Sequence, residues 1–153
     1  MPTHGERYGR AGALSFHHAG VVVADLDAAI AYHRDILGFE VDFLVRDMDD
    51  LFRRTVGLPG VVCDLAQLVA PYASTRIEVL QVRHLPDDVP GWMPVHVGVG
   101  HTAYQVDNIR ASVAALCERG GRILGEIVEF EEGPAAYVVT PARTIIELEE
   151  AWT

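Results

Sequence analysis

Residues 16–41 read FHHAGVVVADLDAAIAYHRDILGFEV, and residues 99–124 repeat their pattern as VGHTAYQVDNIRASVAALCERGGRIL with a constant shift of 83 positions. His18 thereby corresponds to His101. Each copy begins with strand-forming residues and continues with apolar residues at helical spacing, after which a glycine ends the helix. This duplication decides the fold, because it predicts two similar modules.

We expect each module to contain a strand, a helix and further strands. In the first copy, Asp25 is the predicted N-cap of the helix and Gly38 its end. The remaining elements of the first module are strands at 16–23, 39–45, 61–69 and 76–82 and a short helix within 47–56. The second module has a strand at 100–106, a helix at 108–119, and strands near 122–130, 135–140 and 144–149.

Three prolines in residues 84–98 indicate a linker between the modules. We therefore predict a lead-in over residues 1–14, a first module over 15–83, the linker over 84–98 and a second module over 99–153. The modules together form a single domain over residues 15–151.

The composition narrows the function classes. Of 153 residues, 12 are basic and 22 acidic, which gives a formal charge of −10 and disfavours nucleic acid and anionic membrane surfaces as partners. No apolar run approaches the roughly 20 residues that span a bilayer, and the first residues show no signal peptide. We expect a cytoplasmic protein in which Cys63 and Cys117 are reduced thiols.

Strand alternation predicts where four polar side chains point. Val21 and Val23 face the helix in the first strand, so His18 lies on the opposite side, and His101 does the same in the second copy. Glu78 in RIEVL and Glu147 in TIIEL lie between apolar residues that would pack on the helices. Both carboxylates are therefore predicted to point to the same inner side as the histidines.

These four residues predict a metal site. Any one of them alone would be a structural residue, but both types recur in register across the duplication. An enclosed carboxylate is costly unless it is paired or bound to a metal. Two imidazoles and two carboxylates suit one divalent ion, namely Zn, Fe(II), Co, Ni or Mn.

The chain resembles the vicinal oxygen chelate superfamily, which includes glyoxalase I, methylmalonyl-CoA epimerase, extradiol dioxygenases and drug-resistance proteins. The matching stretches are HAGVVVADLDAAIAYHRDILGFEV, RIEVL, HTAYQVDNI and IIELEE. The resemblance implies an α+β fold of two tandem βαβββ modules that form a curled mixed sheet with one metal ion between them. It also implies metal-ligand roles for His18, His101 and Glu147, and for Glu78 as a fourth ligand.

The resemblance further implies a lyase or isomerase of the glyoxalase or epimerase type. Glu147 or Glu78 would abstract a proton next to a metal-bound carbonyl of a small oxygenated substrate. An Fe(II) extradiol dioxygenase that uses His18, His101 and Glu147 is an alternative.

A second alternative is a drug-binding protein without enzymatic activity. Its groove would be lined by aromatic residues, namely Phe43, Tyr72, Trp92 and Tyr104. Relatives are usually homodimers, and the apolar segment 61–69 is a candidate interface.

Overall fold

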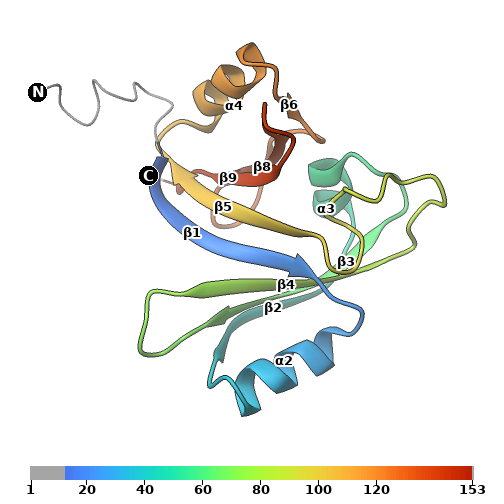
Figure 1. Ribbon diagram of the computed structural model, residues 1–153, viewed down its shortest axis with the longest axis vertical. Coiled ribbons are helices and arrows are strands. Elements are labelled where there is room, and N and C mark those ends of the chain that lie inside the picture. The colour runs from blue at the N-terminus through green and yellow to red at the C-terminus, as the bar shows by residue number, and fades with distance from the viewer. Residues whose placement is uncertain (1–12, 153) are drawn as a thin grey trace, which may run out of the picture. The chain divides into compact units, whose positions relative to one another are not determined.

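The computed structural model describes residues 13–152, in which nine strands and three helices follow one another along the chain (Figure 1). They are β1 (Ala13–Val22), α2 (Leu26–Asp35), β2 (Glu40–Met48), α3 (Asp50–Val56), β3 (Val62–Val69), β4 (Arg76–Arg83), β5 (Gly100–Val106), α4 (Ile109–Glu118), β6 (Arg122–Ile123), β7 (Val128–Glu129), β8 (Pro134–Val139) and β9 (Ile145–Glu149). Helices and mixed strands confirm the predicted α+β class. Most of the predicted lead-in, residues 1–12, lies outside the described part of the chain.

The described residues form two compact units. The first unit comprises residues 18–53 and 58–101, and the second comprises residues 13–17, 54–57 and 102–152. The short segment 54–57, at the end of α3, belongs to the second unit, where the backbone N–H of Glu126 donates to the carbonyl oxygen of Arg54 at 3.0 Å.

In the first unit the strand order is β2-β3-β4-β1, with β1 parallel to β4 and the other pairs antiparallel. The side chain of Asp25 accepts a hydrogen bond from the N–H of Ala28 at 3.0 Å, which confirms the predicted N-cap of α2. Gly38 follows the helix with a φ of 74°, a conformation that favours glycine. The core under α2 consists of Leu26, Ala29, Ala66, Leu68 and Val79.

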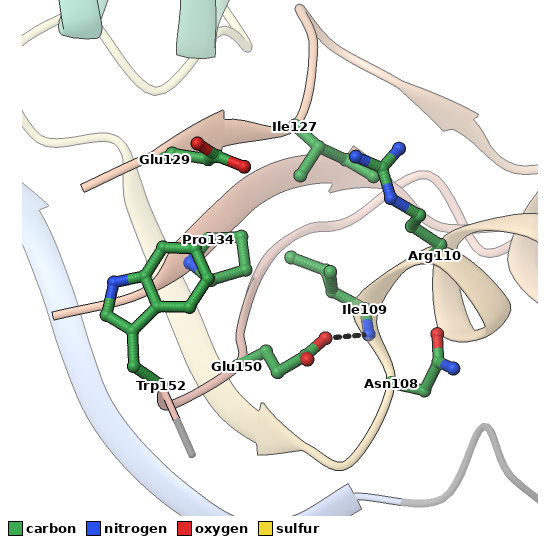
Figure 2. A pocket seen from close by; sticks show the side chains of 8 residues that line it. All are labelled: Asn108, Ile109, Arg110, Ile127, Glu129, Pro134, Glu150 and Trp152. Atoms are coloured by element: carbon green, nitrogen blue, oxygen red, sulfur yellow. Dashed lines mark hydrogen bonds between the residues drawn. The ribbon is translucent and has the colours of Figure 1, made fainter.

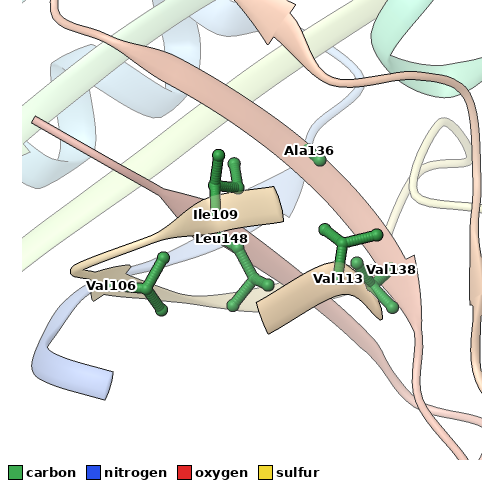
Figure 3. Close-up of a cluster of buried hydrophobic side chains, with 6 residues drawn as sticks. All are labelled: Val106, Ile109, Val113, Ala136, Val138 and Leu148. Carbon is green, nitrogen blue, oxygen red and sulfur yellow. The ribbon is translucent and has the colours of Figure 1, made fainter. Parts of the chain in front are cut away.

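The second unit has the strand order β5-β9-β8-β6, and β7 also pairs with β8. As in the first unit, the first strand is parallel to the last, here β5 to β9. Asn108 caps α4 by accepting the N–H of Ala111 at 2.9 Å. Figure 3 shows the buried cluster between α4 and the strands, formed by Val106, Ile109, Val113, Ala136, Val138 and Leu148.

One predicted strand is interrupted. The stretch near 122–130 forms β6 and β7 with a break between them, because residues 124–126 approach the end of α3. A Cβ atom on Gly125 would lie 2.0 Å from the carbonyl oxygen of Arg54, so only a glycine permits this approach. The prediction of a continuous strand missed this contact, which joins residues about 70 positions apart.

Strand β3 lies between β2 and β4, and six of its eight residues are buried. Segment 61–69 therefore offers little apolar surface beyond the half-buried Val62 and Val69, and its role as an interface with a second chain stays a prediction. No helix in the described part of the chain has the length and apolar character needed to cross a membrane.

A cluster of charged groups around the buried Asp64 carboxylate links β2, β3 and β4. The Asp64 carboxylate accepts hydrogen bonds from Arg83 at 2.7 Å, from the N–H of Asp47 at 2.8 Å and from Arg46 at 3.4 Å. Burial alone raises the pKa of Asp64, but the Asp47 N–H and the two guanidinium groups outweigh it and lower the pKa below the ordinary value.

Candidate metal site

The backbone of the first unit brings the two duplicated histidines together. The N–H of Val22 donates to the carbonyl oxygen of Val99 at 3.1 Å, and the N–H of Gly98 donates to the carbonyl oxygen of Val22 at 2.9 Å. The chain that leads into His101 therefore runs beside β1, which carries His18. The Nε2 atoms of His18 and His101 are 3.1 Å apart.

Gly20 makes room for the second imidazole. A Cβ atom at this position would lie 2.1 Å from Cε1 and 2.5 Å from Nε2 of His101, far inside any permitted contact. Glycine in the interior of a strand weakens the strand, and it is often found where another group must approach closely. Here the approaching group is the imidazole of His101, which lies directly over the β1 backbone.

Glu78 completes a cluster of three residues within the first unit. It is the β4 partner of Gly20 in the parallel register, so its side chain lies at the level of the His101 ring. Its Oε2 is 3.6 Å from Nε2 of His18, and its Oε1 is 3.6 Å from Nε2 of His101. The exposed fractions of His18, Glu78 and His101 are 0%, 5% and 5%.

The geometry of the three residues fits a divalent metal ion. An ion about 2.0–2.1 Å from each ligand atom holds tetrahedral or octahedral ligands about 2.9–3.4 Å apart. The observed separations of 3.1, 3.6 and 3.6 Å lie within a few tenths of an ångström of this range. A buried carboxylate next to two imidazoles also needs a positive charge to offset its desolvation. The cluster can therefore hold a divalent metal ion.

Glu147 belongs to the second unit and is 8% exposed. On β9 it pairs with Ala103 of β5 and with Tyr137 of β8. Its neighbour Leu148 lies in the core under α4, so strand alternation directs Glu147 away from that helix. The same relation holds in the first unit between Glu78 and Val79, which lies in the core under α2.

Several other histidines have structural partners. His17 lies 3.2 Å from the carboxylate of Glu149 within the second unit. His33 donates from Nδ1 to a carbonyl oxygen of α2 at 2.8 Å, and His96 donates from Nε2 to a carbonyl oxygen of the linker at 3.1 Å. Each of these contacts engages one ring nitrogen of its histidine. His4 lies outside the described residues.

The sequence-derived aromatic groove has little support. Tyr72 is 99% exposed and therefore lines no groove. Trp92 is also exposed, whereas Phe43 is half-buried on β2. Tyr104 packs edge to face against Phe16 in the second unit, with ring centroids 5.9 Å apart.

A separate pocket of about 240 Å³ lies in the second unit at the start of α4 (Figure 2). Its lining includes the exposed Trp152 and half-buried Ile127. Glu150 already accepts the N–H of Ile109 there at 2.7 Å, which satisfies a free donor of the first helical turn. None of the four predicted ligands lines this pocket, and we assign no function to it.

Cys63 is buried on β3 and is not suited to bind a metal ion as a thiolate. Burial raises the pKa of its thiol well above the ordinary value, and the negative charge of Glu78 raises it further. The thiol therefore stays protonated at neutral pH. The set of ligand atoms in the first unit is two nitrogens and a carboxylate.

Two residues beside the cluster were missed by sequence reasoning. Gly20 lies two residues after His18 and so shares its face of the strand, and a glycine within a strand of β-branched residues is a signal of close approach. Gln67 was not considered at all. It is buried on β3 directly opposite Glu78, and its only sequence signal is a single amide within the apolar run LAQLV.

The described chain consists of two similar α+β units, and the first unit contains a buried His–His–Glu cluster that is a candidate metal site. Residues 17–137 match the family model described as the Glyoxalase/Bleomycin resistance protein/Dioxygenase superfamily. The chain therefore belongs to this superfamily, the vicinal oxygen chelate superfamily predicted from the sequence.

Several relatives are epimerases. The chain is 27% identical over 151 residues to a 2-epi-5-epi-valiolone epimerase of an Actinomyces species, a match that covers 90% of this chain and 79% of the relative. It is 30% identical over 111 residues to the ethylmalonyl-CoA/methylmalonyl-CoA epimerase of Cereibacter sphaeroides, covering 71% of this chain and 73% of the relative. The structure also superposes on the crystal structure of methylmalonyl-CoA epimerase from Mycobacterium tuberculosis with a TM-score of 0.63 and 19% sequence identity. The match covers 92% of this chain and 90% of that one, so the two proteins share the fold.

Proposed function

We propose that the protein is a metal-dependent isomerase of the epimerase type. It would invert a carbon next to a carbonyl group by removing and returning a proton. The observation that carries the proposal is the buried cluster of His18, Glu78 and His101, whose ligand atoms lie 3.1–3.6 Å apart. The sequence predicted either a lyase or an isomerase, and we favour the isomerase because several relatives are epimerases.

In this proposal His18, Glu78 and His101 hold one divalent ion, which is Zn, Ni, Co, Fe or Mn, and Glu147 of the second unit is the fourth ligand. A bound ion would supply Lewis acidity, which would stabilise the negative charge that develops on the substrate after loss of the proton. The low exposure of the cluster excludes bulk water, which strengthens these electrostatic interactions.

The proton is carried by a glutamate carboxylate. Glu147 or Glu78 takes the proton from the carbon, so that a C–H bond breaks and an O–H bond forms on the carboxylate. The substrate carbon becomes planar, and delivery of a proton to its opposite face by the other glutamate, whose carboxyl group is then protonated, breaks that O–H bond and gives the epimer. No oxidant, reductant or second substrate is needed for this exchange.

The substrate class is a small oxygenated compound with a carbonyl next to an acidic C–H bond. Among relatives, one is named for a 2-epi-5-epi-valiolone and another for ethylmalonyl- and methylmalonyl-CoA. With a formal charge of −10 and only 12 basic residues, the chain is less suited to the phosphates of coenzyme A than to an uncharged substrate. Both compounds are therefore test substrates, and the uncharged one is favoured.

Deuterium exchange tests the proposal directly. The protein is loaded with Co²⁺, Ni²⁺ or Zn²⁺ and incubated in D₂O with 2-epi-5-epi-valiolone or methylmalonyl-CoA, and uptake of one deuterium is followed by mass spectrometry. We expect the wild type to take up deuterium. His101→Ala and at least one of Glu147→Gln and Glu78→Gln should lose this uptake. Glu131→Gln, a control at an exposed position, should take up deuterium like the wild type. If no metal-loaded sample exchanges a proton in either compound, the proposal fails.

The Fe(II) dioxygenase predicted as an alternative is less favoured by the geometry. Oxygen chemistry needs open coordination positions, yet Glu78 lies 3.6 Å from both histidine nitrogens and would occupy one of them. Metal analysis of protein purified without chelators discriminates the alternatives. Stoichiometric iron with oxygen-sensitive activity would favour the dioxygenase, and metal-free protein with tight ligand binding would favour the drug-binding alternative.

We also propose that the protein is a homodimer, as the family resemblance implies. Apolar side chains of β2, which ends the strand order of the first unit, are exposed and would be covered in a dimer. They are Val41, Leu44 and Val45. Light scattering after size exclusion would give twice the chain mass of 16.7 kDa, and a single-chain mass would refute this arrangement.

A further inference from the structure

We propose that Gln67 is a substrate-binding residue whose side-chain amide donates a hydrogen bond to a substrate oxygen beside the metal site. This inference rests on the proposed function, since it takes the substrate to be an oxygen ligand of a metal ion held by His18, Glu78 and His101. It adds a residue that touches the substrate without being a metal ligand.

The position of Gln67 follows from the strand register. In the first unit one level of the sheet runs from Gly20 on β1 to Glu78 on β4, Gln67 on β3 and Phe43 on β2. Directly opposed residues of neighbouring strands have their side chains on the same face, with Cβ atoms about 4.5–5.5 Å apart in antiparallel pairs. Gln67 is therefore the next side chain beyond Glu78 when the face is followed away from His101.

The orientation of the Gln67 amide is set by Arg76. The guanidinium Nη1 of Arg76 donates to Oε1 of Gln67 at 3.1 Å, and it also donates to the carboxylate of Asp42 at 2.7 Å. An arginine has only donors, so the atom of Gln67 that faces it must be the oxygen. The NH₂ group of Gln67 is thereby turned away from Arg76.

Within the described part of the chain this NH₂ group has no hydrogen-bond partner. Gln67 is only 4% exposed, and residues 13–152 supply no acceptor for its amide nitrogen beyond the contact that fixes its oxygen. The amide nitrogen keeps some access to solvent, so an incoming ligand oxygen can reach it and accept its hydrogen bond. The group therefore favours a ligand that presents a carbonyl or carboxylate oxygen and disfavours one that presents an ammonium group.

The experiment measures binding of a simple oxygen chelator, so that it does not depend on turnover. Protein loaded with Co²⁺ is titrated with oxalate, and the change in the visible absorption of cobalt gives the dissociation constant. Gln67→Met removes the donor at nearly constant volume, and Gln67→Glu replaces it with an acceptor of negative charge. Gln81→Met is the matched control, because Gln81 lies on the opposite face of β4 and accepts the N–H of Leu26 at 2.8 Å.

We expect oxalate to bind roughly tenfold more weakly to Gln67→Met, and more weakly still to Gln67→Glu, while the affinity for Co²⁺ changes less than threefold. Gln81→Met should bind oxalate like the wild type. Equal oxalate affinity in the wild type and Gln67→Glu would overturn the inference, as would a loss of Co²⁺ affinity as large as the loss of oxalate affinity. Absence of Co²⁺ binding in the wild type would instead overturn the proposed function, and the inference with it.

Discussion

Replacing Gly20 by alanine adds one methyl group at the closest contact of the candidate metal site. The new Cβ atom would lie 2.1, 2.5 and 2.8 Å from three atoms of the His101 imidazole. An ordinary carbon contact needs about 3.5 Å, so the ring must move by more than 1 Å or the β1 backbone must shift. Metal–ligand distances tolerate only about 0.2 Å, so the displaced His101 no longer serves as a ligand in its present position.

The substitution should change two quantities, namely the free energy of unfolding and the affinity for metal. Overpacking of this kind lowers the free energy of unfolding by about 1–3 kcal/mol in the metal-free protein. Displacing a ligand should weaken metal binding at least as much as losing an outer-shell partner, which costs about 10–100-fold. At a Co²⁺ concentration 100 times the wild-type dissociation constant, bound metal stabilises the wild type by about 2.7 kcal/mol and a variant with 100-fold weaker binding by only about 0.4 kcal/mol.

Urea denaturation with and without Co²⁺ measures both quantities on the same samples. Gly91→Ala is the matched control, because a Cβ atom there meets nothing within 4 Å and Gly91 has no positive φ. We expect the control to behave like the wild type. If Gly20→Ala gained as much stability from Co²⁺ as the wild type, His101 would not be a metal ligand in its present position, and the reasoning would be refuted.

Three further predictions concern stability. Asp64→Asn should lower the free energy of unfolding at pH 7. The pKa of Asp64 is lowered in the folded state, so its stabilising contribution is present above the ordinary pKa of 3.8 and is lost as the pH falls through the folded-state pKa. Urea denaturation curves of the variant and the wild type should therefore differ more at pH 7 than at pH 3. Leu148→Ala should lower the free energy of unfolding by about 2–5 kcal/mol because it leaves a cavity under α4, whereas Leu37→Ala, at a 56% exposed position, should lower it by less than about 1 kcal/mol. Similar losses for the two variants in urea denaturation would contradict the assigned core. Removal of metal by EDTA should lower the Tm of metal-containing wild type and leave His101→Ala unchanged, and an unaffected wild type would argue against a bound ion at this site.

The duplication explains how much of the fold could be predicted. Asp25, Gly38 and the alternation around Val79 are local signals, and each indicates the element that the structure contains. The break at Gly125 could not be predicted, because it depends on the backbone of Arg54, far away in the chain. Local periodicity carries no information about which distant segment a glycine will meet.

The residues of the candidate site likewise fall into those that the sequence repeat predicts and those that only the structure reveals. Both histidines and both glutamates could be singled out because the repeat placed them in register, and His18, Glu78 and His101 lie together in the first unit. The role of Gly20 needs the position of the His101 ring, and that of Gln67 needs the pairing of β3 with β4. Neither residue has a counterpart of the same type in the other copy, so the repeat could not point to them.

This difference between the copies bears on the proposed reaction. Glu78 lies between Gly20 and Gln67 in the first unit, and Glu147 lies between Ala103 and Tyr137 in the second. The duplication thus repeats the candidate ligands but not their neighbours. An epimerase acts on a chiral carbon. If the two glutamates had identical neighbours, the site would not distinguish the two faces of that carbon. Under the proposed function, identical ligands hold the ion, and the unlike neighbours of the two glutamates decide which carboxylate moves the proton and how the substrate is oriented.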